Sequence, residues 1–79
     1  MEIPKFHETF IPILKVLENG ETLQSREMYR KVIDKFYTGL SKEQLEQTTK
    51  SGDILINNRI AWGKSYLKKG GFIEFPHTA

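Results

Sequence analysis

The residues whose chemistry is easiest to interpret lie together near the C-terminal end of the chain. Two amides and a guanidinium come first and three amines follow: Asn57, Asn58, Arg59, Lys64, Lys68 and Lys69. An asparagine amide can pair bidentately with adenine in the DNA major groove, an arginine can bind guanine or phosphate, and lysines suit backbone phosphates. No Asp or Glu occurs between Asn57 and Gly71. This pattern favours a DNA-facing surface over the alternative, a lysine-rich face that is simply solvated.

A helix must position these side chains, and the apolar residues between them define it. An apolar stripe recurs at i, i+4, i+7 and i+11 and consists of Ile56, Ile60, Gly63 and Leu67. Asp53 is expected to be the N-cap. Gly70-Gly71 is expected to end the helix, because glycine adopts the left-handed C′ conformation without steric cost. Gly63 predicts a close crossing with another helix, and the alternative is a glycine that the helix merely tolerates.

With that stripe facing inward, the other positions of the helix form an outward face and two flanks. The outward face consists of Asn58, Trp62, Ser65 and Lys69, and the flanks consist of Asn57, Lys64 and Lys68 on one side and Arg59 and Tyr66 on the other. Helix-turn-helix proteins contact bases with the N-terminal part of the reading helix, so Asn57, Asn58 and Arg59 are expected nearest the bases. Trp62 either caps the core, stacks on a partner or completes an interface. All these residues are candidates for DNA binding.

Three further helices are expected to hold the reading helix in place. Apolar spacing and capping patterns predict Lys5–Glu18 with an irregular middle at Pro12, Arg26–Tyr37 capped by Ser25, and a short helix opened by a Ser41–Gln44 capping box. A start near Thr9 is the alternative for the first of these. Phe72–Phe75 is interpreted as a short strand, and Glu21–Gln24 as a small strand or a loop. The predicted fold class is mainly α with a minor β component, a winged helix-turn-helix whose wing is truncated at the C-terminus.

The core and the extent of the domain follow from the same pattern. The expected buried centre consists of Phe10, Leu14, Leu17, Val32, Phe36, Ile56, Ile60 and Leu67. A length of 79 residues suits a single domain spanning residues 1–79. A lone exposed strand at the C-terminal end is not stable, so we expect this domain to be a fragment of a longer protein.

Composition argues against several classes of protein. The chain has no cysteine, which excludes a disulfide framework and a thiolate metal site. The longest mostly apolar run, residues 10–14, is far too short to cross a membrane. The residues after Met1 do not show the basic and apolar pattern of a signal peptide, so a cytoplasmic protein is expected. His7 and His77 lack the spacing of metal ligands, and no Glu-x-Lys or Asp-x-Lys nuclease motif occurs. We therefore expect this domain to have no cofactor, no metal, no small-molecule substrate and no enzymatic activity.

Nearly the full length of the sequence resembles the N-terminal domain of Mrr-type restriction proteins. The resemblance rests on two segments. The first is the apolar run Phe10–Leu17, which a proline interrupts, and the second is Asn58–Glu74. The second segment combines Asn-Arg, a tryptophan three residues later, Tyr-Leu-Lys-Lys and a glycine before an apolar strand.

The resemblance implies a winged-helix DNA-binding module attached to a C-terminal nuclease domain that acts on modified, typically methylated, foreign DNA. The parent protein is then expected to be a modification-dependent restriction endonuclease. The resemblance draws attention to Asn58, Arg59, Trp62, Tyr66 and Lys69. The expected partner is double-stranded DNA, and a homodimer is left open. The alternative is a protein-interaction or dimerisation module of the same shape, with Trp62 and Tyr66 as apolar anchors.

Overall fold

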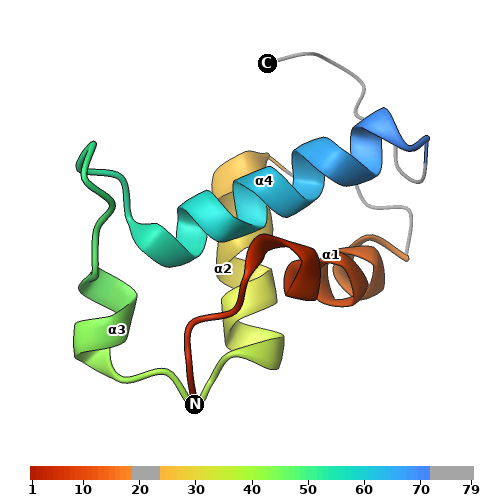
Figure 1. The fold of residues 1–79 in the computed structure, drawn as a ribbon. Helices are drawn as coiled ribbons and strands as arrows, with labels where there is room; N and C mark the ends of the chain where they lie inside the picture. The colour runs from red at the N-terminus through yellow and green to blue at the C-terminus, as the bar shows by residue number, and fades with distance from the viewer. Residues whose placement is uncertain (19–23, 72–79) are drawn as a thin grey trace.

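A computed structural model describes residues 1–18 and 24–71. A short 3₁₀ helix, η1, precedes four α-helices in the described part of the chain (Figure 1). Their bounds are η1 Phe6–Thr9, α1 Phe10–Leu17, α2 Ser25–Phe36, α3 Lys42–Glu46 and α4 Leu55–Lys69. The mainly helical prediction is confirmed. The strand expected at Phe72–Phe75 and most of the possible strand at Glu21–Gln24 lie outside the described residues, so the winged helix stays a prediction.

The first helical segment is irregular, as its proline predicts. Residues Phe6–Thr9 are 3₁₀ and Phe10–Leu17 are α-helical, which together span almost the whole of the predicted helix. The backbone N–H of Lys5 donates to Oε1 of Glu8 at 2.8 Å and closes the N-terminal turn. Pro12 is the third residue of α1, where a missing N–H removes little helical hydrogen bonding. The proline therefore lies where the change from 3₁₀ to α-helix has just occurred.

The two serines that were expected to be N-caps have different roles. Ser41 caps α3 as predicted, because its Oγ accepts from the N–H of Gln44 at 3.1 Å and its own N–H donates to Oε1 of Gln44 at 2.8 Å. The prediction for Ser25 is wrong. Helix α2 begins at Ser25 itself and its N-cap is Gln24, which makes no side-chain capping bond. The Ser25 hydroxyl instead accepts a hydrogen bond from α4.

Asp53 does not cap α4 either, because it lies in the turn before α4 and its backbone N–H and C=O groups form the hydrogen bonds of that turn. The N–H of Thr49 donates to the carbonyl oxygen of Asp53 at 2.7 Å, and the N–H of Asp53 donates to Oγ1 of Thr49 at 3.3 Å. Ile54 then takes an extended conformation, and α4 begins one residue later than the predicted cap would place it. The first N–H of α4 donates to the carbonyl oxygen of Gln47 at 2.7 Å. Backbone hydrogen bonding thus replaces the expected carboxylate cap.

The C-terminal end of α4 agrees with the sequence. Gly70 is still helical at φ −77°, and its N–H donates to the carbonyl oxygen of Tyr66 at 3.0 Å. Gly71 follows at φ +77°, the left-handed conformation that favours glycine. The double glycine therefore ends the helix, with Gly71 as the residue that needs to be glycine.

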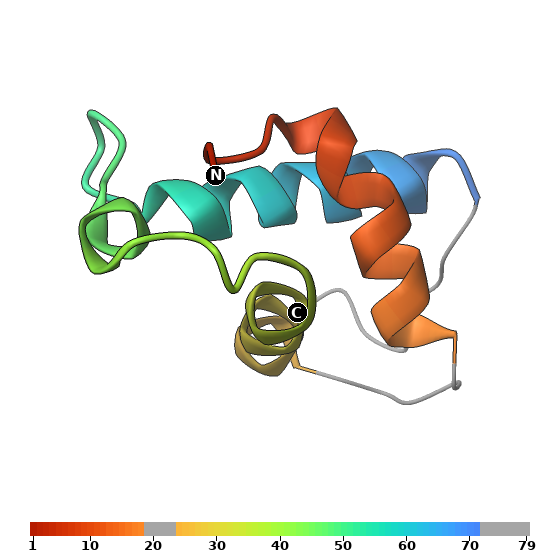
Figure 2. The same ribbon diagram turned by 90° about the horizontal axis from the view of Figure 1, so that it is seen from below.

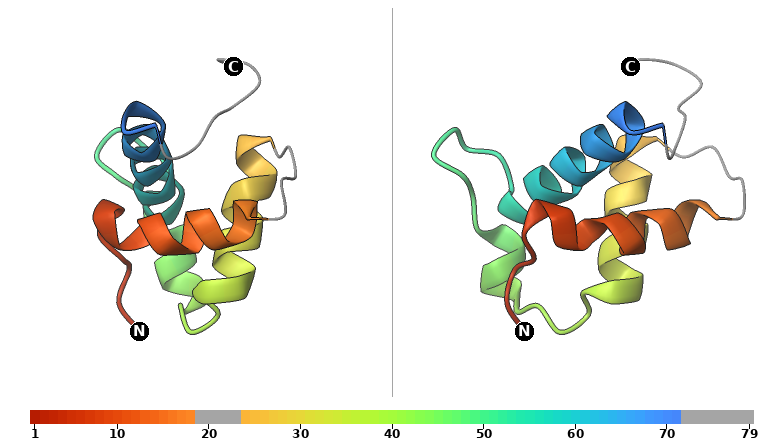
Figure 3. Two further views of the ribbon diagram at one scale, coloured as in Figure 1. Left: turned by 90° about the vertical axis from the view of Figure 1, so that its right-hand side faces the viewer. Right: turned by 45° about the vertical axis from the view of Figure 1, so that its right-hand side comes forward.

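The helices enclose one apolar core. Figure 2 shows α4 lying across α1, with α3 beside the N-terminal end of α4, and Figure 3 shows α2 on the side of α4 away from η1. The buried apolar residues are Ile13, Val16, Met28, Val32, Tyr37, Leu40, Ile56, Ile60 and Leu67. The predictions for Val32, Ile56, Ile60 and Leu67 are confirmed.

The predicted core is wrong in the first helix and at the end of the second. Four residues expected at the buried centre are only partly buried at its edge: Phe10, Leu14, Leu17 and Phe36. The inner stripe runs instead through Thr9 of η1 and Ile13 and Val16 of α1, of which Thr9 and Ile13 are fully buried. Helix α1 packs against both α2 and α4, and the branched side chain of Ile13 lies close to Gly63 of α4.

That glycine is Gly63, and the predicted close crossing is confirmed. A Cβ atom at this position would overlap Oγ1 of Thr9, lie 2.9 Å from the carbonyl oxygen of Phe6 and lie 3.2 Å from Cδ1 of Ile13. The Thr9 hydroxyl donates to the same Phe6 oxygen at 2.5 Å, so the one buried polar side chain of the described core is satisfied. The absence of a side chain at Gly63 lets η1 lie directly on α4.

Candidate nucleic-acid interface

Helix α4 presents its polar residues as the sequence predicts. Its buried residues are Ile56, Ile60, Gly63 and Leu67, which confirms the register of the inward stripe. None of the nine candidate residues is buried. The half-buried ones are Asn57, Asn58, Arg59 and Lys64, and the exposed ones are Trp62, Ser65, Tyr66, Lys68 and Lys69. The candidates therefore divide into four partly covered side chains and five exposed ones.

One flank of α4 packs against the N-terminal segment. The guanidinium Nη1 of Arg59 donates to the carbonyl oxygen of Pro4 at 3.1 Å. Pro4 is itself buried, so this hydrogen bond fixes the lead-in to η1 against α4. Sequence reasoning assigned Arg59 to DNA alone and missed this structural role. A guanidinium has five donors, so the bond to Pro4 leaves others to face solvent.

The same flank carries an aromatic cluster. The ring of Tyr66 stacks on Phe6 with centroids 4.9 Å apart and an interplanar angle of 26°. Trp62 lies 6.3 Å from Tyr66 and is tilted by 40°. Trp62 remains 53% exposed and Tyr66 48% exposed, which does not fit the alternative that Trp62 caps the core. The cluster is available to stack on a partner or to join an interface.

The opposite flank of α4 faces the first turns of α2. Nζ of Lys64 donates to Oγ of Ser25 at 2.7 Å, and Ser25 also shares a hydrogen bond with the Tyr29 hydroxyl. Burial lowers the pKa of Lys64, and the neighbouring charge of Lys68 lowers it further. Burial raises the pKa of Tyr29, and the hydrogen bond with Ser25 offsets part of that rise. Lys64 thus joins α4 to α2, which its sequence position did not reveal.

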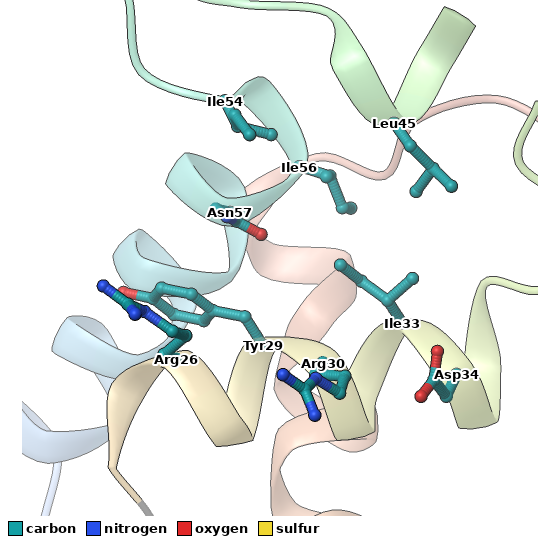
Figure 4. A pocket seen from close by; sticks show the side chains of 9 residues that line it. All are labelled: Arg26, Tyr29, Arg30, Ile33, Asp34, Leu45, Ile54, Ile56 and Asn57. Atoms are coloured by element: carbon teal, nitrogen blue, oxygen red, sulfur yellow. The ribbon is translucent and has the colours of Figure 1, made fainter. Parts of the chain in front are cut away.

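Two hollows lie along this flank and share residues, so they form one groove between α2 and α4. The first, drawn in Figure 4, has a volume of about 300 Å³ and is lined by Arg26, Tyr29, Arg30, Ile33, Asp34, Leu45, Ile54, Ile56 and Asn57. The second, of about 330 Å³, is lined by Tyr29, Asp53, Ile54, Asn57, Asn58 and Ala61. Both volumes are at the lower limit for pockets that enclose a small ligand. The groove is better suited to a group that protrudes from a larger partner.

Asn57 and Asn58 both line this groove, whereas Lys68 and Lys69 lie at the far end of α4. Lysines in the last turn of a helix also interact favourably with its dipole, so part of their effect is on the helix itself. Arg26 and Arg30 are exposed on the α2 side of the groove and were not among the candidates from the sequence. Their i, i+4 spacing on a predicted helix was a signal that could have found them.

Residues 1–18 and 24–71 contain no group of three or more His, Cys, Asp and Glu that could hold a metal ion. Within the same ranges, no helix has the length and apolar character needed to cross a membrane.

Comparison with known proteins identifies one family. The family model described as "Mrr N-terminal domain" matches residues 6–79. No match was found among curated proteins. A search of solved structures also found no match.

Proposed function

The chain belongs to the Mrr N-terminal domain family, and we propose that it is the DNA-binding module of an Mrr-type restriction protein. In this proposal the module does no chemistry itself. It positions a nuclease, located elsewhere in the parent protein, on modified foreign double-stranded DNA. The parent is then a modification-dependent restriction endonuclease that acts in the cytoplasm.

The observation that carries the proposal is the charge and placement of α4. Its fifteen residues, Leu55–Lys69, include Arg59 and three lysines and contain no acid. A buried stripe holds the helix on the core, so its polar residues face outward. DNA carries about one negative charge per 1.7 Å of helix axis, and an acid-free, amide-bearing helix is a suitable partner for it.

The positions and contacts of the candidate side chains suggest which of them contact bases, which contact phosphates and which also stabilise the fold. Asn57 and Asn58 lie in the first turn of α4, which is where reading helices contact bases. Lys68 and Lys69 are exposed and suit phosphates. Lys64 and Arg59 also hold α2 and the N-terminal segment in place, so their loss would affect folding as well as binding. We therefore expect the cleanest binding effects at Lys68 and Lys69.

The test is the salt dependence of binding to duplex DNA. The 79-residue chain is titrated into a fluorescently labelled duplex at a series of salt concentrations, and anisotropy gives the Kd. Electrostatic contacts to phosphates predict that log K falls linearly with log[salt], with a slope of about −0.9 per phosphate contacted. Absence of binding at low salt would contradict the proposal.

A second candidate function is supported by the aromatic cluster. Trp62 and Tyr66 are exposed and lie beside the partly buried Phe6, and aromatic anchors of this kind are common at the centre of protein interfaces. In this alternative the domain is a protein-interaction or dimerisation module. It predicts no DNA binding at low salt, and a self-association that Trp62→Ala weakens in sedimentation equilibrium experiments.

A further inference from the structure

Arg26 and Arg30 extend the positive surface of α4 onto α2. Both side chains are exposed, and within the described residues neither forms an ion pair. They are one helical turn apart on α2 and line the same hollow as Asn57 of α4 (Figure 4). Two guanidinium groups that lack an acidic partner in the described structure therefore stand across a groove from an amide that is expected to face DNA bases.

We propose that Arg26 and Arg30 bind the phosphates of one DNA strand while Asn57 and Asn58 face the adjacent groove, so that DNA crosses the boundary between α2 and α4. This inference rests on the proposed function and specifies its surface. It adds two residues of α2 to the contact. It also separates this surface from the aromatic cluster on the other flank of α4.

The spacing of the two arginines fits a nucleic-acid backbone. Four residues of α-helix rise about 6 Å, and two successive phosphate steps along one strand rise about 7 Å. A guanidinium presents paired N–H donors that match the oxygens of a phosphate. Arg26 and Arg30 can therefore reach two phosphates of the same strand that are two steps apart, without a change in the direction of α2.

The charges around the groove favour an anion at the end where α2 begins. Two acids line the groove: Asp34 lies one turn beyond Arg30, and Asp53 precedes α4. At the other end of the groove Arg26 lies beside Tyr29 (Figure 4), and Ser25, the residue before Arg26, accepts a hydrogen bond from the ammonium of Lys64. The positive excess is therefore greatest around Arg26 and Lys64, and it falls toward Asp34. This gradient suits a polyanion that crosses the first turns of α2.

The test compares two double variants that remove the same charge. Arg26→Ala/Arg30→Ala removes the proposed phosphate contacts, and Lys15→Ala/Lys42→Ala removes two exposed cations of α1 and α3. Affinity for a labelled duplex is measured by anisotropy over a salt series, and circular dichroism confirms folding. The arginine variant is expected to bind at least about tenfold more weakly at low salt, because it loses two charge-assisted contacts to phosphates. The slope of its log K against log[salt] should become about 1.8 less steep. The control variant Lys15→Ala/Lys42→Ala should match the wild type in affinity and slope.

The inference is overturned if the arginine variant keeps wild-type affinity and salt slope. Should Lys68→Glu/Lys69→Glu lose binding under the same conditions, the proposed function stands and only the contribution of α2 is wrong. An equal loss in the arginine variant and the Lys15/Lys42 control also overturns the inference, because net charge alone would then explain the effect. If the wild-type chain does not bind duplex DNA at low salt, both the proposed DNA-binding function and the proposed contacts of Arg26 and Arg30 are wrong.

Discussion

Lys64 and Ser25 join α4 to α2 through a 2.7 Å hydrogen bond from Nζ to Oγ. This bond explains why Ser25 does not cap its own helix, although its residue type and position favour that role. It also means that Lys64, a phosphate contact by sequence reasoning, helps to set the geometry of the groove. A single lysine therefore contributes to both the fold and the proposed surface.

A double-mutant cycle tests this bond. Ser25→Ala, Lys64→Met and the combined variant are compared by urea unfolding, which gives the free energy of unfolding for each. We expect a coupling energy of about 0.5–1.5 kcal/mol, since the bond is only partly buried. Ser41→Ala is the control, because Ser41 caps α3 and should show no coupling with Lys64→Met. Additive effects of Ser25→Ala and Lys64→Met would contradict the bond.

The close crossing at Gly63 predicts that alanine there is destabilising. In an exposed helix position Gly→Ala stabilises by about 1 kcal/mol. Here the added Cβ would meet Thr9 and the backbone oxygen of Phe6, and we expect a net loss of about 1–3 kcal/mol. Thermal unfolding of Gly63→Ala measures the loss, with the exposed Ser65→Ala of the same helix as control. A Gly63→Ala protein more stable than the wild type would refute the crossing.

The register of α1 can be tested with two neighbouring residues. Ile13 is fully buried, whereas Leu14 is only partly buried at the edge of the core. Ile13→Ala should therefore cost about 2–5 kcal/mol, and Leu14→Ala should cost less. Urea unfolding of the two variants gives the comparison directly. If Leu14→Ala is the more destabilising of the two, the inner stripe of α1 is the one that the sequence pattern favoured.

The raised pKa of Tyr37 leads us to expect that the protein loses stability at alkaline pH. Burial raises the pKa of its phenol above 10.0, and the charge of Glu8 adds to the rise. Its hydroxyl donates to the carbonyl oxygen of Glu8 at 3.5 Å. Because the folded-state pKa is the higher one, this stabilisation is fully present below pH 10 and is lost as the pH rises through the folded pKa.

The measurement is the unfolding free energy of the wild type and of Tyr37→Phe at pH 9 and pH 11. The phenylalanine variant cannot ionise at this position, so its stability relative to the wild type should improve at the higher pH. Tyr29 and Lys64 also titrate in this range, but they are present in both proteins and cancel in the difference. A difference that stays constant between the two pH values would contradict the role of Tyr37.

The sequence predicted the helices well because their signals are local. The stripe of α4, the capping box at Ser41 and the terminal glycines each depend on residues only a few positions apart. Two of the errors have tertiary causes, and the first is at Ser25, which is engaged by Lys64, thirty-nine residues away. The error at Asp53 has a local cause, because Thr49, four residues earlier, holds Asp53 in a turn. The inner face of α1 is set by its contact with Gly63, which no periodicity within α1 can show.

Only part of the candidate site could likewise be predicted from the sequence. The polar face of α4 follows from its register, so the candidates there could be found from spacing alone. The groove could not, because it requires Arg26 and Arg30 of α2 to lie beside Asn57 of α4. The second role of Arg59 depends on its bond to Pro4, a residue fifty-five positions earlier. Pairings at such separations appear only once the helices are packed.

The central claim, that α4 carries the DNA-facing surface, is tested most directly by reversing two exposed charges at its C-terminal end. Lys68→Glu/Lys69→Glu is titrated by fluorescence anisotropy against duplex DNA at low salt, with folding checked by circular dichroism. The claim predicts that the folded variant loses binding to all duplex sequences alike, because phosphate contacts carry no sequence information. A folded variant that binds as tightly as the wild type would contradict it, and the protein-interaction function would then be favoured.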